Sequence, residues 1–343
     1  MTTSAACTPM TDTSQQTASV TDRVKPVALG HATTSAYFLK DIACFIGADE
    51  AVSLVTSDGS IKRVDATTGG ILCSASDGKR IILGCDDGRV VALNASGETQ
   101  TLATDAKRRW IDNVAVHTDG SIAYSAGKTA FVKQPKGAEK SLDVPSTVGG
   151  LAFAPKGFRV AIAHYNGVTL WFPNMAGSGE LLEWKGSHLG VIFSPDGKFL
   201  VTAMHEAALH GWRLVDAKHM RMTGYPGRVR SMAWTTGGKA LATSGADCVI
   251  LWPFASKDGP MGKAPAMLAP LPSKVSAVAC HPATDVIAAG YADGTVLMIR
   301  MDDGAEILVR RRDGAPIAGL AWSADGKRLA LATETGEAGL LTL

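Results

Sequence analysis

The chain has 343 residues, of which 46% are apolar and 37 are glycine, and 34 Lys and Arg nearly balance 32 Asp and Glu, giving a formal charge of +2. So large an apolar fraction excludes a wholly disordered chain, because it buries enough surface to offset the conformational entropy lost on folding. The near-neutral balance excludes bulk attraction to nucleic acid or to an anionic membrane surface, which requires a strong basic excess.

The N-terminal segment, MTTSAACTPMTDTSQQTASVTDR, is polar and lacks both the basic region and the apolar region of a secretory signal. No stretch approaches the roughly 18 consecutive apolar residues of a membrane-spanning helix. We therefore expect a disordered polar tail over residues 1–23 and one domain over residues 24–343, in the cytoplasm. In that reducing compartment the scattered cysteines are expected to be core thiols and not disulfides.

From residue 35 onward a pattern of a short apolar strand, a tight turn, a second strand and a third strand recurs along the chain. The clearest copies are GVIFSPDGKFLVTAMHEAALHGWRL from Gly190 and GLAWSADGKRLALATETGEAGLLTL from Gly319. The second turn residues are Asp41, Gly78, Gly120, Gly157, Gly197, Gly238, Asp285 and Gly326, with intervals by subtraction of 37, 42, 37, 40, 41, 47 and 41 residues. Alternating apolar positions, Gly and Asp turns and the absence of helical periodicity predict an all-β fold of antiparallel hairpins.

A four-stranded sheet of about 40 residues cannot bury both of its faces, so the repeats must pack sheet against sheet in a row or in a closed ring. The last repeat stops at Leu343 after its third strand, and residues 24–29 can supply the missing outer strand. This pairing would close the ring and remove exposed sheet edges. Eight first strands predict eight four-stranded blades.

The chain resembles a divergent, bacterial-type branch of the WD40-repeat β-propellers over about residues 24–343. The resemblance rests on Gly30-His31, on SPDGK at Ser194–Lys198, and on the third-strand tryptophans Trp171, Trp212 and Trp252. It implies a propeller that binds partners on one face, and it offers seven blades as the alternative count, since seven is commonest in that family. No such tryptophan is followed by Asp, so we expect the family's buried His–Asp network to be mostly absent.

No nucleophile elbow, P-loop or dinucleotide-binding glycine motif is present, so we expect no enzyme activity and no cofactor. The string from His205-Glu206 to His210 misses the H-E-x-x-H spacing by one residue. A weak metal-site alternative remains, because His164 and His205 each precede a third-strand tryptophan by seven residues. With Glu206 or Cys85 nearby, two imidazoles could hold a transition metal. The other interpretation is that these histidines only pack in loops or bind backbone.

Basic residues gather in the loops before the first strands, and in a propeller such loops surround the mouth of the central channel. The candidate partner-binding residues are Arg108, Arg109, Trp110, His188, Arg228, Arg230, Lys274, Arg311 and Arg312. Acidic residues are expected further out on the same face, at Asp49, Glu50, Asp86, Asp87, Asp247 and Asp293. Bidentate arginines beside an exposed tryptophan suit an acidic or carboxylate-bearing peptide, whereas the alternative is that these charges only solvate the loops.

Residues 255–272 account for the longest interval and predict a long outer hairpin, which is either a contact surface or a plain linker. The sequence therefore predicts a monomeric, non-catalytic scaffold or adaptor that binds protein partners through the channel mouth, and neither nucleic acid nor membrane. A metal-binding or small-molecule-binding propeller that serves as a sensor or as an accessory in metal handling is the alternative.

Overall fold

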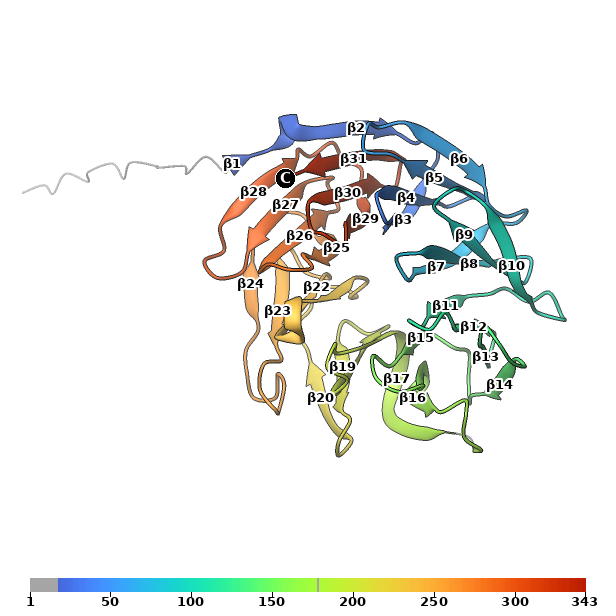
Figure 1. Ribbon diagram of the computed structural model, residues 1–343. Coiled ribbons are helices and arrows are strands. Elements are labelled where there is room, and N and C mark those ends of the chain that lie inside the picture. The colour runs from blue at the N-terminus through green and yellow to red at the C-terminus, as the bar shows by residue number, and fades with distance from the viewer. Residues whose placement is uncertain (1–17, 178) are drawn as a thin grey trace, which may run out of the picture.

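The computed structural model describes residues 18–177 and 179–343, so most of the predicted tail, residues 1–17, lies outside the described part. Antiparallel sheets are arranged radially around a common centre (Figure 1), which confirms the predicted all-β propeller. No helix among the described residues is long and apolar enough to cross a membrane.

The first three sheets follow one another along the chain, each with four strands in sequence order. The first contains β3 (Thr33–Leu39), β4 (Ile42–Gly47), β5 (Ala51–Val55) and β6 (Ile61–Asp65). The second contains β7 (Ile71–Ser76), β8 (Arg80–Cys85), β9 (Arg89–Asn94) and β10 (Thr99–Thr104). The third contains β11 (Asn113–Val116), β12 (Ile122–Ala126), β13 (Thr129–Lys133) and β14 (Lys140–Asp143).

Four sheets complete the ring. The fourth has six strands, β15 (Gly150–Phe153), β16 (Val160–Trp171), β17 (Glu180–Phe193), β18 (Phe199–Met204), β19 (Leu209–Arg213) and β20 (Lys218–Met222). The fifth contains β21 (Met232–Trp234), β22 (Ala240–Thr243), β23 (Val249–Pro253) and β24 (Ala266–Leu268), with the 3-10 helix η2 (Thr236–Gly238) between β21 and β22. The sixth contains β25 (Val275–Cys280), β26 (Val286–Tyr291), β27 (Val296–Arg300), β28 (Glu306–Arg310) and the short parallel strand β1 (Ala18–Ser19). The seventh contains β29 (Ile317–Trp322), β30 (Arg328–Thr333), β31 (Glu337–Thr342) and β2 (Val24–Ala28), which follows the 3-10 helix η1 (Thr21–Arg23).

Counted as hydrogen-bonded sheets among the described residues, the ring has seven blades and not the predicted eight. The difference arises at one place, because the predicted fourth and fifth units join in the six-stranded sheet β15–β20. The long strand β17 connects them: its residues up to Ser187 pair with β16, and its residues from His188 onward pair with β18.

The other long strand of this sheet, β16, turns back on itself. His164 Nε2 lies 2.9 Å from Thr169 Oγ1, whereas five residues of straight strand would span about 16 Å. The reversal falls at Asn166 and Gly167, where φ is 67° and 147°. Each of the two joined units therefore keeps four antiparallel passes of the chain, and what the sequence did not reveal is that the two units share one continuous strand, β17.

The N-terminal strand closes the ring as predicted. β2 pairs antiparallel with β31 from Val24↔Leu341 to Ala28↔Glu337, and this makes it the outermost strand of the last sheet. Just before it, β1 pairs with the outer edge of β28. The described structure thus begins inside the predicted tail, at residue 18, and the first described residues contact two neighbouring sheets.

Inner strands of neighbouring sheets are also joined by polar contacts near the centre. Ser35 Oγ lies 3.0 Å from Ser74 Oγ, and Ser276 Oγ donates to the carbonyl of Ile317 at 2.8 Å. These bonds fix adjacent sheets to one another, so the loops that enter the inner strands start from a rigid base.

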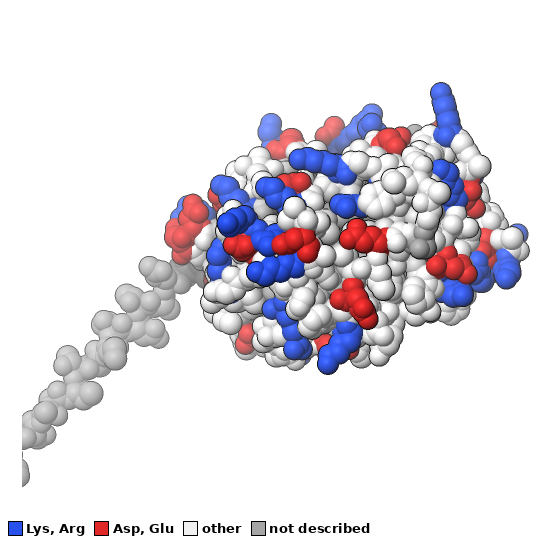
Figure 2. Space-filling view, turned by 90° about the horizontal axis from the view of Figure 1, so that it is seen from below, with Lys and Arg blue, Asp and Glu red and all other residues white. Residues whose placement is uncertain are grey.

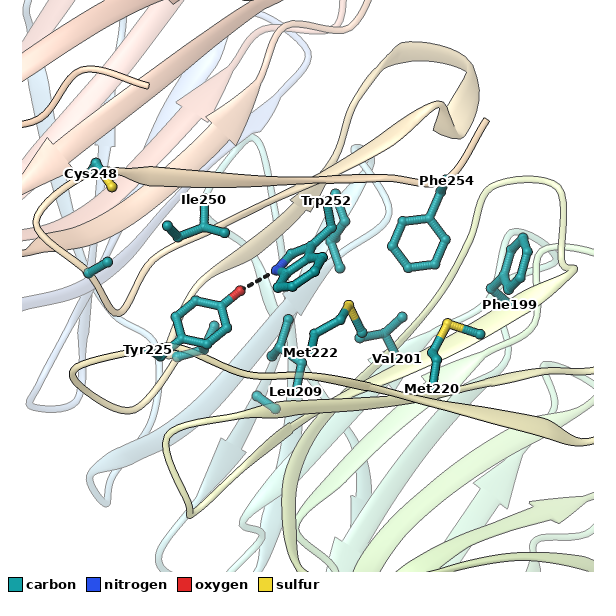
Figure 3. Packing of buried hydrophobic residues seen from close by; sticks show 14 residues of the cluster. Phe199, Val201, Leu209, Met220, Met222, Tyr225, Cys248, Ile250, Trp252 and Phe254 are labelled. Atoms are coloured by element: carbon teal, nitrogen blue, oxygen red, sulfur yellow. Dashed lines mark hydrogen bonds between the residues drawn. The ribbon is translucent and has the colours of Figure 1, made fainter. Parts of the chain in front are cut away.

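A buried chain of polar contacts joins the fifth sheet to the loop that precedes it (Figure 3). Trp252 Nε1 donates to the Tyr225 hydroxyl at 2.7 Å, and that hydroxyl donates to Thr243 Oγ1 at 2.7 Å. Thr243 Oγ1 in turn donates to the carbonyl of Ile250 at 3.1 Å. All three side chains are buried, and each donor in the chain has an acceptor.

We expect Tyr225→Phe to lower the free energy of unfolding by about 1–3 kcal/mol, because it leaves the buried indole N–H of Trp252 without an acceptor. Urea unfolding followed by tryptophan fluorescence measures this change. Tyr165→Phe is the matched control, since that side chain is 58% exposed. Equal stability of the two variants would show that the Tyr225 hydroxyl contributes nothing.

The predicted long hairpin at residues 255–272 lies against the neighbouring sheet. Arg213 of β19 forms ion pairs with Asp216 and with Asp258 in the insertion. Met261 packs against the buried cluster that contains Phe199. The first half of the insertion therefore has a structural role as a bridge between two sheets.

Candidate functional site

Two sets of loops share one face of the ring, which we call the loop face. Because neighbouring strands run antiparallel, the loops entering the inner strands and the loops joining second to third strands leave every sheet at the same end. Hydrogen bonds connect the two sets: Asp105 N donates to the carbonyl of Gly88, and Ala292 N donates to that of Lys274, both at 2.8 Å. Apart from His188, the predicted partner-binding residues belong to loops at this end of the strands.

The loop between β10 and β11 is built around a buried carboxylate. Asp105, only 5% exposed, accepts the backbone N–H groups of Lys107 and Arg109 at 3.1 and 3.0 Å. It also accepts the Arg109 guanidinium at 2.7 Å, and this bond is the largest of the effects that hold the pKa of Asp105 below its usual value. Arg109, a predicted binding residue, is therefore occupied inside its own loop.

Further contacts fix this loop on both sides of Trp110. Arg109 Nη1 donates to the carbonyl of Ala126 at 3.0 Å, and Ile111 is fully buried with its N–H on the carbonyl of Cys85 at 3.1 Å. The Trp110 side chain between them is 63% exposed. Arg108, also exposed, has a φ of 54°. The loop thus presents a large apolar side chain and a guanidinium from a fixed backbone.

Most of the other predicted basic residues are exposed. Those that are exposed and form no ion pair within residues 18–177 and 179–343 are Arg108, Arg228, Arg230, Lys274, Arg311 and Arg312. Several acids expected around them are paired locally instead, as Asp49 is with Arg63 at 3.0 Å and Asp87 with Arg89 at 2.7 Å. On the side of the molecule seen in Figure 2, acidic and basic side chains are interspersed, so no single-sign field covers that side.

His188 is not a surface residue, and its assignment to the binding face was wrong. Its side chain is 1% exposed, because the continuous strand β17 carries it into the core. Nε2 donates to the carbonyl of Trp184 at 3.0 Å, and Nδ1 lies 2.7 Å from Thr202 Oγ1. Desolvation lowers the pKa of this imidazole, which keeps it neutral and structural.

The structure does not bring the four residues of the metal-site alternative together. His164 uses both ring nitrogens, Nδ1 on the carbonyl of Tyr165 and Nε2 on Thr169 Oγ1, each at 2.9 Å. Cys85 lies in the second sheet, and burial raises the pKa of its thiol to about 12, so it is not the thiolate that binds metals. His205 and Glu206 are exposed neighbours in the loop after β18. Within the described ranges no group of three or more His, Cys, Asp or Glu could hold a metal ion.

Sequence reasoning missed two exposed apolar side chains on the loop face. Leu72 is 42% exposed at the start of β7, and Tyr165 is 58% exposed at the turn of β16. The Asn-Gly pair after Tyr165 is a hairpin-turn signal that would have placed this side chain at a strand end. Leu72 carries no such signal, because it lies in an ordinary apolar strand pattern.

Comparison with known proteins supports the fold in two ways. The family model "Anaphase-promoting complex subunit 4 WD40 domain" matches residues 273–343, and no curated protein sequence matches the chain. The C-terminal WD40 domain of Sif2 superposes with a TM-score of 0.75 at 14% identity, over 96% of this chain and 99% of that one.

Two other solved structures share the architecture. The computationally designed protein Ika8 gives a TM-score of 0.73 at 18% identity, over 92% of this chain and 99% of that one. The RRP9 WD40 repeats give 0.60 at 16% identity, over 81% of this chain and 95% of that one. A WD40 model therefore matches the C-terminal repeats, and the likeness to solved WD40 structures shows a β-propeller fold along nearly the whole length of the chain.

Proposed function

We propose that this propeller is a non-catalytic scaffold or adaptor that binds a protein partner on the loop face, with Trp110 as the anchor. The observation that carries the proposal is a tryptophan 63% exposed on a loop whose flanking residues are fixed by buried contacts. Tryptophan and arginine dominate the binding energy of protein interfaces. A fixed loop also loses little conformational entropy on binding, which favours affinity.

The chemistry of the surrounding residues favours an acidic partner segment. Arg108 is next but one to Trp110, and Arg228, Arg230 and Lys274 project from two other loops of the same face without ion pairs in the described part of the chain. Guanidinium groups bind carboxylates bidentately. WD40 propellers generally mediate protein–protein interaction, and the matching family model is named for a subunit of a multiprotein complex.

Two further features bear on where and how the protein works. Cys44, Cys73, Cys85, Cys248 and Cys280 are free thiols, which supports a reducing compartment such as the cytoplasm. The N-terminal strand completes the last sheet within the same chain, so no second copy is needed to cover that sheet edge, and we propose a monomer.

The proposal predicts that Trp110→Ala combined with Arg108→Glu abolishes capture of the physiological partner. Loss of a central tryptophan costs an interface about 2–4 kcal/mol, which weakens binding roughly thirtyfold or more. Tagged full-length protein added to a native extract, with quantitative mass spectrometry of bound proteins, measures the effect.

The matched control is Val215→Ala combined with Lys198→Glu. Val215 is 86% exposed, and both residues lie in turns at the other end of the strands. Partners bound by the wild type and the control variant but lost from the Trp110 variant support the proposal. Equal partner levels on all three proteins would refute it.

A further inference from the structure

A groove lies away from Trp110, where the N-terminal strand closes the ring. It has a volume of about 630 Å³ and runs between β2 with β31 on one wall and the C-terminal end of β28 on the other. Figure 1 shows β2 along the outside of β31, with β28 beside it. Thr21 of η1 also lines the groove. The groove therefore lies beside the segment that connects the sixth and seventh sheets.

Small side chains keep the groove open. In the register of the last sheet, Pro26 pairs with Gly339 and Val27 pairs with Ala338. A Cβ on Gly339 would lie 2.7 Å from Val24 Cγ1, so only glycine fits beside that side chain. The wall along β2 is therefore apolar and shallow.

Three arginines line the rim of the groove, and they differ in whether an acidic residue already pairs with them. Arg310 is occupied, because it donates to the carboxylates of Asp313 and Glu337 at 2.9 Å each. Arg311 and Arg312 also line the groove, are exposed, and take part in none of the ion pairs formed by the described residues. Asp313 and Glu337 are thus already paired with Arg310, and the guanidinium groups of Arg311 and Arg312 remain available to a ligand.

The shape of the groove fits an extended chain. Its wall along β2 runs from Val24 to Ala28, and five residues of strand span about 16 Å. Pro26 has no N–H, so another strand cannot continue the sheet at this point of β2. An occupant must therefore be held by side-chain contacts, with carboxylates on the arginines and apolar groups along β2.

We propose that this groove binds an extended acidic peptide segment of a protein partner, with its carboxylates on Arg311 and Arg312 and apolar side chains against Val24, Pro26 and Ala28. The structure thus moves these two arginines from the channel mouth to a second binding surface, which lies beyond the Trp110 site. An acidic segment is favoured because both free charges of the rim are positive and the acids of the rim are already paired.

Selection from a random 12-residue peptide library displayed on phage tests the proposal on the full-length protein. Selected peptides should be enriched in Asp and Glu beside apolar residues. Measured by fluorescence anisotropy, their affinity should fall roughly tenfold or more for Arg311→Glu with Arg312→Glu, because each lost charged hydrogen bond weakens binding severalfold or more. Ala28→Trp, a change at an exposed position, should fill the groove and weaken binding similarly.

Two control variants separate the groove from other surfaces. Lys136→Glu with Lys156→Glu makes the same change in net charge at exposed positions in other turns and should bind normally. Trp110→Ala should also bind normally, so failure of the Trp110 interface and failure of the groove are distinguishable. Selection of no groove-dependent peptide, selection of peptides without acids, binding lost in Trp110→Ala, or displacement of the peptide by millimolar phosphate alone would each overturn the proposal.

Discussion

Deletion of residues 1–29 is expected to abolish cooperative folding of the ring. This deletion removes all five residue pairs between β2 and β31. It also removes the buried side chains of Val27 and Leu29, 5% and 6% exposed, from the cluster shared by the first and last sheets. Burial of each such side chain contributes about 1.5–3 kcal/mol, so roughly 3–6 kcal/mol is lost before the hydrogen bonds are counted.

The deletion also exposes the edge of β31, and an unpaired strand edge promotes aggregation. Circular dichroism melting and size-exclusion chromatography report the two effects separately. Deletion of residues 1–23 is the matched control, because it removes β1 and η1 but keeps β2. If the 1–29 and 1–23 deletions melted at the same temperature as the full chain, strand β2 would not be the closing element.

Ring closure was predictable because it depends on chain order and strand count alone. The turns were predictable for a related reason: Gly197 and Gly326, two of the predicted turn residues, have φ values of 75° and 72°, which only glycine adopts readily. Local backbone chemistry therefore determines where the strands begin and end.

What escaped prediction depends on contacts between side chains. Arg109 is typical of a binding residue by type and loop position, yet the buried carboxylate of Asp105 occupies it. His188 belongs to a predicted loop, but the strand pairing of β17 continues through it into the core. A single sequence gives residue types and periods, and it does not reveal which charged group already has a partner.

The histidines of the fourth sheet show the same contrast between satisfied and unsatisfied groups. His164 and His188 use both ring nitrogens in hydrogen bonds. His210 is fully buried, and neither of its ring nitrogens has a hydrogen-bond partner among the described residues. It stacks on Trp184 with ring centroids 4.0 Å apart, and it meets Trp212 edge-on at 4.8 Å. Its side chain is therefore accommodated as an apolar ring.

Burial and the neighbouring titratable groups oppose the protonation of His210. Desolvation is the main cause, and His188 on β17 together with His219 and Arg221 on β20 adds further repulsion, which lowers the pKa of His210 to about 3. Between this value and the ordinary pKa of 6.5, the unfolded chain binds a proton that the folded chain does not. The free energy of unfolding therefore falls as the pH drops below about 6.5, by roughly 3–5 kcal/mol on approaching pH 3.

We expect His210→Phe to reduce the loss in free energy of unfolding on acidification. It should also raise that free energy at pH 7 by about 1 kcal/mol, because it removes two buried nitrogens without partners while keeping an aromatic ring against Trp184. Urea unfolding midpoints between pH 7 and pH 4 measure both effects. His205→Phe is the matched control, since His205 is an exposed histidine in the adjacent loop. The lowered pKa values of His164 and His188 contribute in the same direction, so the slope should be reduced and not abolished. A His210→Phe variant that lost stability with acid as steeply as the wild type and the control would show that the orphaned imidazole is not what makes the ring sensitive to acid.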